Sequence, residues 1–169
     1  MHNVRLETLQ HTVDAAVDDP ATARLQIELA GEWQVAGGPQ FRGRVPFPGG
    51  EIELTADFPP LLGGEGRAPS PLAYCFWGGI ACYAMTYATE AAREGVELKG
   101  LRARVLAVVD LSRSLGVSDA PPVEKLTWEL DVDADAPAET LARLKDLADE
   151  RCPGYYCLTN PIPVETRLA

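Results

Sequence analysis

The chain has 169 residues, of which 46% are hydrophobic and 24% are charged, and its formal net charge at pH 7 is -10. This composition is typical of a globular protein and excludes the disordered and fibrous classes, and the length favours one domain. Because a negative chain repels phosphate backbones and anionic lipids, we expect neither nucleic acid nor a membrane as a partner.

The N-terminal residues 1–20 are predicted to form a helical extension in front of a single domain over residues 21–169. Residues Leu6–Val17 have the amphipathic pattern of a short helix, which ends before Pro20 because proline disfavours helix continuation. The segment has no pattern of a secretory leader. We therefore expect a cytoplasmic protein whose thiols are kept reduced.

Alternating apolar residues predict a β-meander over residues 23–58. The alternation is carried by two sets of side chains: Leu25, Ile27, Leu29, Trp33 and Val35, and then Ile52 and Leu54. Such alternation is typical of strands that bury one face. The next segment, residues 59–70, is rich in turn-forming residues and is predicted to be a loop.

A long apolar stretch predicts a central helix over residues 71–94. It is uncharged from Leu72 to Thr89, but its glycines and hydroxyl groups argue against a membrane-spanning helix. A glycine inside a helix costs about 1 kcal/mol relative to alanine. The consecutive residues Gly78 and Gly79 therefore indicate that another segment approaches the helix closely there.

Two of the four cysteines, Cys75 and Cys82, share a face of small side chains on this helix. Seven residues place them about 10.5 Å apart along an unbroken helix, beyond the ~7 Å limit on the Cα separation of a disulfide, so they cannot bridge. The pattern leaves two interpretations open. The face either packs against another helix, from this or a second subunit, or borders a cavity where one thiol reacts.

Downstream, the pattern predicts strands within residues 98–133, a helix over 137–151 and a final strand over 162–168. Mixed helices and antiparallel strands indicate an α+β architecture. The other two cysteines, Cys152 and Cys157, flank Pro-Gly-Tyr-Tyr in a predicted loop. Their spacing is neither that of a Cys-x-x-Cys redox motif nor that of a zinc site, so no metal is expected.

The order and spacing of these segments resemble the OsmC/Ohr family, over roughly residues 24–168. A Leu-Gly-Gly loop, a proline, a long helix and an alternating strand follow one another in "LLGGEGRAPSPLAYCFWGGIACYAMTYATEAAREGVELKGLRARV". The second helix, a Cys-Pro corner and a closing strand are matched by "DADAPAETLARLKDLADERCPGYYCLTNPIPV". The N-terminal helix is similar to the extension of one OsmC-like subgroup. Cys82 and Cys152 occupy the two cysteine positions of the family.

The resemblance implies antiparallel sheets packed around a long central helix, in an intertwined homodimer. It also implies a thiol peroxidase that reduces small organic hydroperoxides with an external dithiol and no bound cofactor. Cys82 would be the peroxidatic nucleophile and Cys152 the resolving cysteine. The resemblance assigns no role to Cys75 or Cys157.

The resemblance also implies how the nucleophile is activated, because a free thiol, with a pKa of about 8.5, is only a few per cent thiolate at neutral pH. Active members supply an arginine from the N-terminal strands, for which Arg42 and Arg44 are the candidates here. They orient it with a glutamate ten residues before the helical cysteine, where this chain has Leu72. This departure favours an alternative function, a catalytically weak OsmC-like protein that binds a small apolar ligand at the dimer interface.

Overall fold

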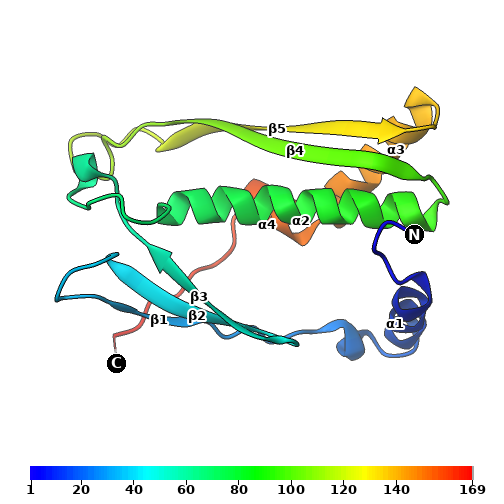
Figure 1. The fold of residues 1–169 in the computed structure, drawn as a ribbon, viewed down its shortest axis with the longest axis horizontal. Coiled ribbons are helices and arrows are strands. Elements are labelled where there is room, and N and C mark those ends of the chain that lie inside the picture. The colour runs from blue at the N-terminus through cyan, green and yellow to red at the C-terminus, as the bar shows by residue number, and fades with distance from the viewer. Residues whose placement is uncertain (169) are drawn as a thin grey trace.

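The computed structural model describes residues 1–168. A long helix is accompanied by two antiparallel sheets and by shorter helices (Figure 1). The first sheet has the strand order β1-β2-β3, and its strands are β1 (Ala30–Trp33), β2 (Phe41–Phe47) and β3 (Gly50–Ala56). The second sheet is a hairpin of β4 (Leu98–Val109) and β5 (Val123–Ala134). The predicted α+β class with antiparallel sheets is confirmed.

Three of the four helices within residues 1–168 stand where the sequence predicted a helix, and α4 is additional. They are α1 (Leu6–Asp18), α2 (Pro71–Arg93), α3 (Ala138–Arg151) and α4 (Pro153–Thr159), with short 3-10 turns η1 (Pro20–Ala23) and η2 (Pro60–Leu62). The central helix α2 begins where Ser70 Oγ accepts the N–H of Ala73 at 3.2 Å, a typical N-cap. It ends before Gly95, whose φ of 71° reverses the chain as a C-terminal glycine does.

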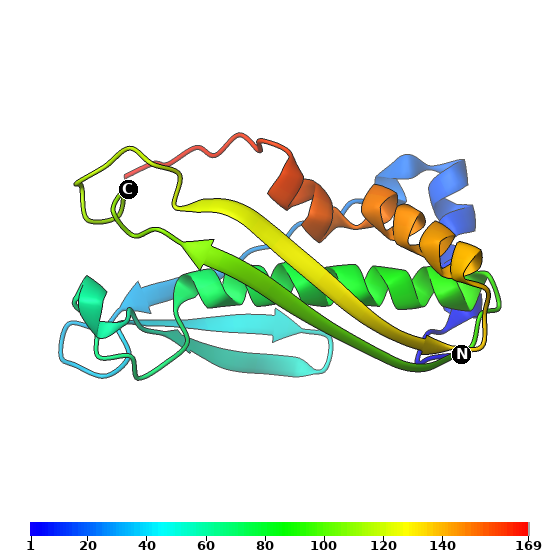
Figure 2. The ribbon, with the colours of Figure 1, turned by 90° about the horizontal axis from the view of Figure 1, so that it is seen from above.

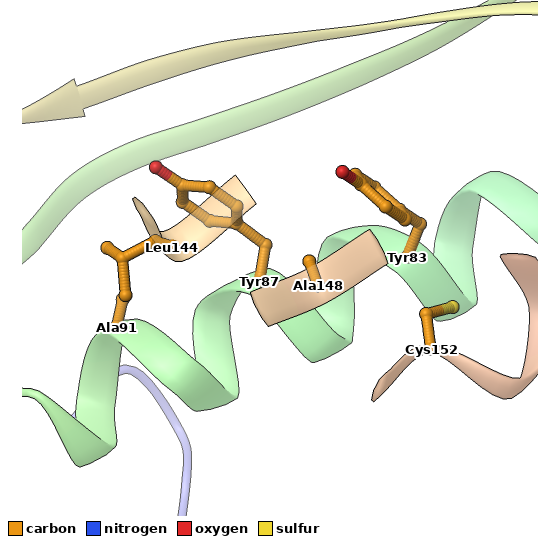
Figure 3. Close-up of a cluster of buried hydrophobic side chains, with 6 residues drawn as sticks. All are labelled: Tyr83, Tyr87, Ala91, Leu144, Ala148 and Cys152. Carbon is orange, nitrogen blue, oxygen red and sulfur yellow. The ribbon is translucent and has the colours of Figure 1, made fainter. Parts of the chain in front are cut away.

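Helix α2 lies between the two sheets (Figure 1), with the β4–β5 hairpin on one side and β1–β3 on the other. Helices α3 and α4 run along its flank (Figure 2). The core forms where α2 meets α3, and its buried side chains are those of Tyr83, Tyr87, Ala91, Leu144, Ala148 and Cys152 (Figure 3). This core therefore places Cys152, at the end of α3, next to the middle of α2.

The predicted first strand is longer than the one that forms. Residues Leu25, Ile27 and Leu29 lie outside β1 and are exposed, although their alternation predicted a half-buried strand. A strand forms only where its N–H and C=O groups find a neighbour, and β1 pairs with β2 only from Ala30 to Trp33. The prediction was right about the meander and wrong about its beginning.

Two predictions about the C-terminal region are wrong. Residues 162–168 form no strand within the described chain. Their side chains alternate as in a strand, but no neighbouring strand provides partners for their backbone N–H and C=O groups. The segment around Cys157 is the helix α4 and not a loop. Pro153 stands at the first position of α4, where its fixed φ suits a helix start and its missing N–H costs no hydrogen bond.

None of the helices within residues 1–168 combines the length and the apolar character needed to cross a bilayer.

Candidate thiol site

The structure brings Cys82 and Cys152 together. Cys82 is half-buried in the middle of α2, and Cys152 is 1% exposed at the junction of α3 and α4. Their side chains are neighbours, since Cys152 is among the groups that raise the pKa of Cys82 and Gly154, two residues after Cys152, lies against Cys82. Both are free thiols. The pair can therefore carry reversible disulfide chemistry without a large movement of the chain.

The start of α4 completes the site with backbone N–H groups. The Sγ of Cys152 accepts the N–H of Tyr155 at 3.3 Å and so caps α4. The N–H of Gly154 donates to the Cys82 sulfur. Such donors stabilise a thiolate more than a thiol. Sequence reasoning missed both, because the helix that aims these N–H groups was predicted to be a loop.

Gly154 at the start of α4 lies directly against Cys82 of α2. A Cβ at this position would lie 2.9 Å from the Cβ of Cys82 and 3.3 Å from its Sγ. Any larger residue would therefore push α4 away from the nucleophile. The sequence signal for this contact was the glycine directly after the Cys-Pro corner.

Burial raises the pKa of the Cys82 thiol above its ordinary value, and this is the largest effect on the group. The N–H of Gly154 lowers the pKa, while Cys152 and Cys157 raise it again through their own negative charge. The balance is a raised pKa. In a single chain Cys82 is therefore a neutral thiol at neutral pH, and a cation is needed to activate it.

We expect the alkylation rate of Cys82 to keep rising with pH beyond the point where a free thiol levels off. The thiolate is the reactive form, and burial delays its formation to higher pH. The measurement is the rate of iodoacetamide labelling at Cys82 between pH 6 and about 10, by peptide mass spectrometry, with free glutathione as the reference. A profile that levels off below that of glutathione would show that a cation already activates Cys82.

The two candidate arginines lie on β2, away from the thiol pair within one chain. Arg42 pairs with Glu53 at 3.7 Å, and Arg44 pairs with Glu51 at 3.1 Å, both carboxylates being on β3. Neither arginine is among the groups that shift the pKa of Cys82. Within residues 1–168 the structure thus brings the two cysteines together and leaves the predicted cations on the separate sheet.

A different ion cluster, which sequence reasoning missed, shares a groove with Cys82. Glu90 is only 4% exposed, and its carboxylate accepts hydrogen bonds from Arg151 at 2.6 Å and Arg93 at 3.4 Å. The groove holds about 390 Å³ and runs along α2 from Cys82 to these arginines. Leu9 of α1 forms part of its wall. The cluster ties the end of α3, directly before Cys152, to α2.

Replacing Arg151 with methionine is expected to lower the free energy of unfolding by about 2 kcal/mol, because the buried Glu90 carboxylate loses its shorter hydrogen bond. The measurement is urea unfolding at neutral pH. The control is Arg102→Met, whose pair with Asp131 is 87% and 71% exposed and is expected to contribute less than about 0.5 kcal/mol. Equal effects of the two variants would contradict a structural role for the buried cluster.

A second groove is larger than the one beside Cys82. It holds about 980 Å³ between α2, β5, α3 and α4. Its inner wall is an aromatic cluster in which the ring of Tyr83 lies 5.2 Å from Trp128 and 5.8 Å from Tyr155. The Tyr83 hydroxyl donates to Asp149 at 2.5 Å, and burial together with this carboxylate raises the pKa of Tyr83. Tyr83 is therefore a fixed hydrogen-bond donor to Asp149.

The remaining candidate positions lie at the edge of the site. Cys75 is exposed and, like Leu72, lines the larger groove, so it does not join the Cys82–Cys152 pair. Within residues 1–168, no group of three or more His, Cys, Asp or Glu side chains is arranged to hold a metal ion.

The two thiols therefore lie within an α+β fold of antiparallel sheets around a long central helix. The family model for OsmC-like proteins matches residues 64–167, and the chain belongs to this family. No curated protein sequence matches the chain.

Solved structures show the same fold. An OsmC-like protein from Mycoplasma pneumoniae is 14% identical with a TM-score of 0.59, over 80% of this chain and 88% of that one. An organic hydroperoxide resistance protein from Legionella pneumophila is 20% identical with a TM-score of 0.53, over 80% of this chain and 91% of that one. At these identities the likeness establishes the fold.

Proposed function

We propose that the protein reduces organic hydroperoxides with Cys82 as the peroxidatic and Cys152 as the resolving cysteine. The observation that carries this proposal is the contact between the two thiols, which lie far apart in the sequence and belong to different helices. The burial of Cys152 adds support, since a resolving thiol needs access to its partner and not to solvent. The Legionella structure is that of an organic hydroperoxide resistance protein.

The reaction follows from the arrangement of the thiols. The Cys82 thiolate attacks the terminal oxygen of the hydroperoxide, the O–O bond breaks, and the alcohol leaves with one proton. The sulfur of Cys82 is then a sulfenic acid. Cys152 attacks that sulfur, forms the disulfide and releases water. An external dithiol supplies the two electrons that restore both thiols.

We propose further that the protein acts as a homodimer and that the dimer supplies the missing cation. Trp77 and Met85 on α2 are 68% and 71% exposed, and an exposed apolar stripe of this kind marks an interface. The first sheet also exposes large apolar side chains, among them Ile52. In this arrangement the sheet of a second copy covers α2 and brings Arg42 or Arg44 towards Cys82.

A peroxidase assay with dithiothreitol tests the proposed activity. Wild-type protein is expected to consume many equivalents of tert-butyl hydroperoxide per chain, and Cys75→Ser is the control that removes an exposed thiol outside the pair. Consumption limited to one equivalent per chain would contradict turnover.

Arg42→Met and Arg44→Met identify the activating cation, because the variant that lacks this cation should be alkylated more slowly at Cys82. Light scattering tests the dimer, and a mass near that of one chain would refute it.

The larger groove favours a second candidate function, the binding of a small apolar ligand. Its volume of about 980 Å³ is in the range of small-molecule sites. Trp128 lines it, and within the described chain the buried Nε1–H of Trp128 has no hydrogen-bond partner. A ligand with an acceptor oxygen would satisfy that donor. Quenching of tryptophan fluorescence by an apolar carbonyl compound, with no peroxide turnover, would favour this function.

We place the protein in the cytoplasm, because four free cysteines suit a compartment that keeps thiols reduced.

A further inference from the structure

A third thiol, that of Cys157, lies beside the pair and has no part in the proposed reaction. Helix α4 packs against α2 at Gly154, in direct contact with Cys82. Residues three apart on a helix are neighbours on its surface, about 5–6 Å from one another. Cys157 therefore follows Gly154 by one turn on the side of α4 that faces α2. The next residue, Leu158, contacts the Gly79 position of α2, so Cys157 lies at the edge of the surface of α4 that packs on α2.

Solvent access increases from one thiol to the next. Cys152 is 1% exposed, Cys82 is half-buried, and Cys157 is exposed. The negative charge of a Cys157 thiolate also contributes to the raised pKa of Cys82, as expected of two sulfurs that are close in space. A disulfide between Cys82 and Cys152 is thus mostly buried, and Cys157 is the most accessible of the three sulfurs.

We propose that Cys157 is an exit thiol, which takes over the disulfide from Cys152 and presents it to the external dithiol at the surface. The inference rests on the proposed function, because it needs the Cys82–Cys152 disulfide as its starting point. It adds a catalytic residue to the reductive half of the cycle.

The exchange is balanced in atoms and electrons. The Cys157 thiolate attacks Cys82 Sγ, a Cys82–Cys157 bond forms, the Cys82–Cys152 bond breaks, and the electron pair leaves on the Cys152 sulfur. The N–H of Tyr155, 3.3 Å from that sulfur, stabilises the departing thiolate. The external dithiol then attacks Cys157, which releases Cys82, and its second thiol frees Cys157 as the reductant closes its own disulfide.

Helical geometry selects Cys82 as the sulfur that Cys157 attacks. Five residues of helix separate Cys152 from Cys157 by about 7.5 Å along the axis alone. This exceeds the ~7 Å limit on the Cα separation of a disulfide. A bond between Cys152 and Cys157 would therefore unwind α4, whereas Cys82 lies across the helix–helix contact.

The test is the single-turnover reduction of protein first oxidised with one equivalent of tert-butyl hydroperoxide. Dithiothreitol is added, and samples quenched in acid are alkylated and mapped by mass spectrometry. Cys157→Ser is expected to slow the loss of the Cys82–Cys152 disulfide by about tenfold, because an intermolecular attack replaces an intramolecular one. Cys75→Ser, which removes the other exposed thiol, should match the wild type. Reduction of Cys157→Ser at the wild-type rate would overturn the proposal.

A second variant tests the contact directly. In Cys152→Ser, the sulfenic acid on Cys82 is expected to condense with Cys157, giving a Cys82–Cys157 disulfide that is absent from Cys152→Ser/Cys157→Ser. A sulfenic acid with equal lifetime in both variants would refute the contact. The disulfide map of the wild type distinguishes a failure of the proposed function from a failure of the exit thiol. If no Cys82–Cys152 disulfide forms after peroxide, both the proposed function and the exit thiol are refuted. If that disulfide forms and Cys157→Ser has no effect on its reduction, only the exit thiol is refuted.

Discussion

Cys82→Ser is expected to abolish hydroperoxide consumption, and the double variant Cys152→Ser/Cys157→Ser is expected to stop the cycle after one turnover. The first variant removes the only sulfur that is half-buried on α2 in contact with Cys152, so no sulfenic acid can form at the site. The second retains that sulfur and removes both the buried thiol that resolves it and Cys157, which could take its place. The measurement is peroxide loss with dithiothreitol as the reductant, together with dimedone labelling of Cys82.

The two variants should therefore differ in their products, although both lose turnover. Dimedone should label Cys82 in Cys152→Ser/Cys157→Ser within seconds of peroxide addition, because no thiol at the site captures the sulfenic acid. Cys75→Ser serves as the control and should keep full activity, because Cys75 is exposed at the edge of the larger groove. Full activity of Cys82→Ser would show that another residue is the nucleophile.

Gly154→Ala is expected to separate the two thiols without removing either of them. The new Cβ would lie 2.9 Å from the Cβ of Cys82, an atom fixed to the backbone of α2, so α4 must move. Overpacking of this kind costs about 1–3 kcal/mol of stability. Since Cys152 caps α4, the displacement also carries the resolving sulfur away from Cys82.

Urea unfolding and the rate of disulfide formation after peroxide measure the two effects of Gly154→Ala. The control is Gly100→Ala in β4, where a Cβ would meet its nearest atom, the Cβ of Asp133, at an ordinary 3.6 Å. We expect Gly154→Ala to form the Cys82–Cys152 disulfide at least about tenfold more slowly, because effective concentration falls steeply with misplacement. Unchanged formation would mean that the Gly154 contact does not position the thiols.

Sequence reasoning succeeded where local patterns determine the structure. The limits of α2 follow from Ser70 and Pro71 at its start and Gly95 after its end, and these are signals that a sequence displays. The β4–β5 hairpin follows from its alternation. In contrast, the strand predicted over residues 162–168 could form only beside a partner strand. An alternating pattern does not show whether such a partner is present.

The candidate site could be predicted in part. The contact of Cys82 with Cys152 was implied by family resemblance, and no spacing rule relates cysteines on separate helices. Glu90 with Arg151 was missed because a buried ion pair between two helices has no local signature. Arg42 and Arg44 lie on β2 of the N-terminal sheet. Their distance from Cys82 within one chain is a property of tertiary structure that residue order does not show.

The most direct test of the account is the disulfide map of the wild-type protein after a stoichiometric organic hydroperoxide. Reduced protein is mixed with one equivalent of tert-butyl hydroperoxide, alkylated rapidly and digested without reductant. The account predicts that a Cys82–Cys152 peptide pair appears within seconds and disappears on addition of dithiothreitol. Free, alkylated Cys82 and Cys152 after minutes of exposure to peroxide would contradict it.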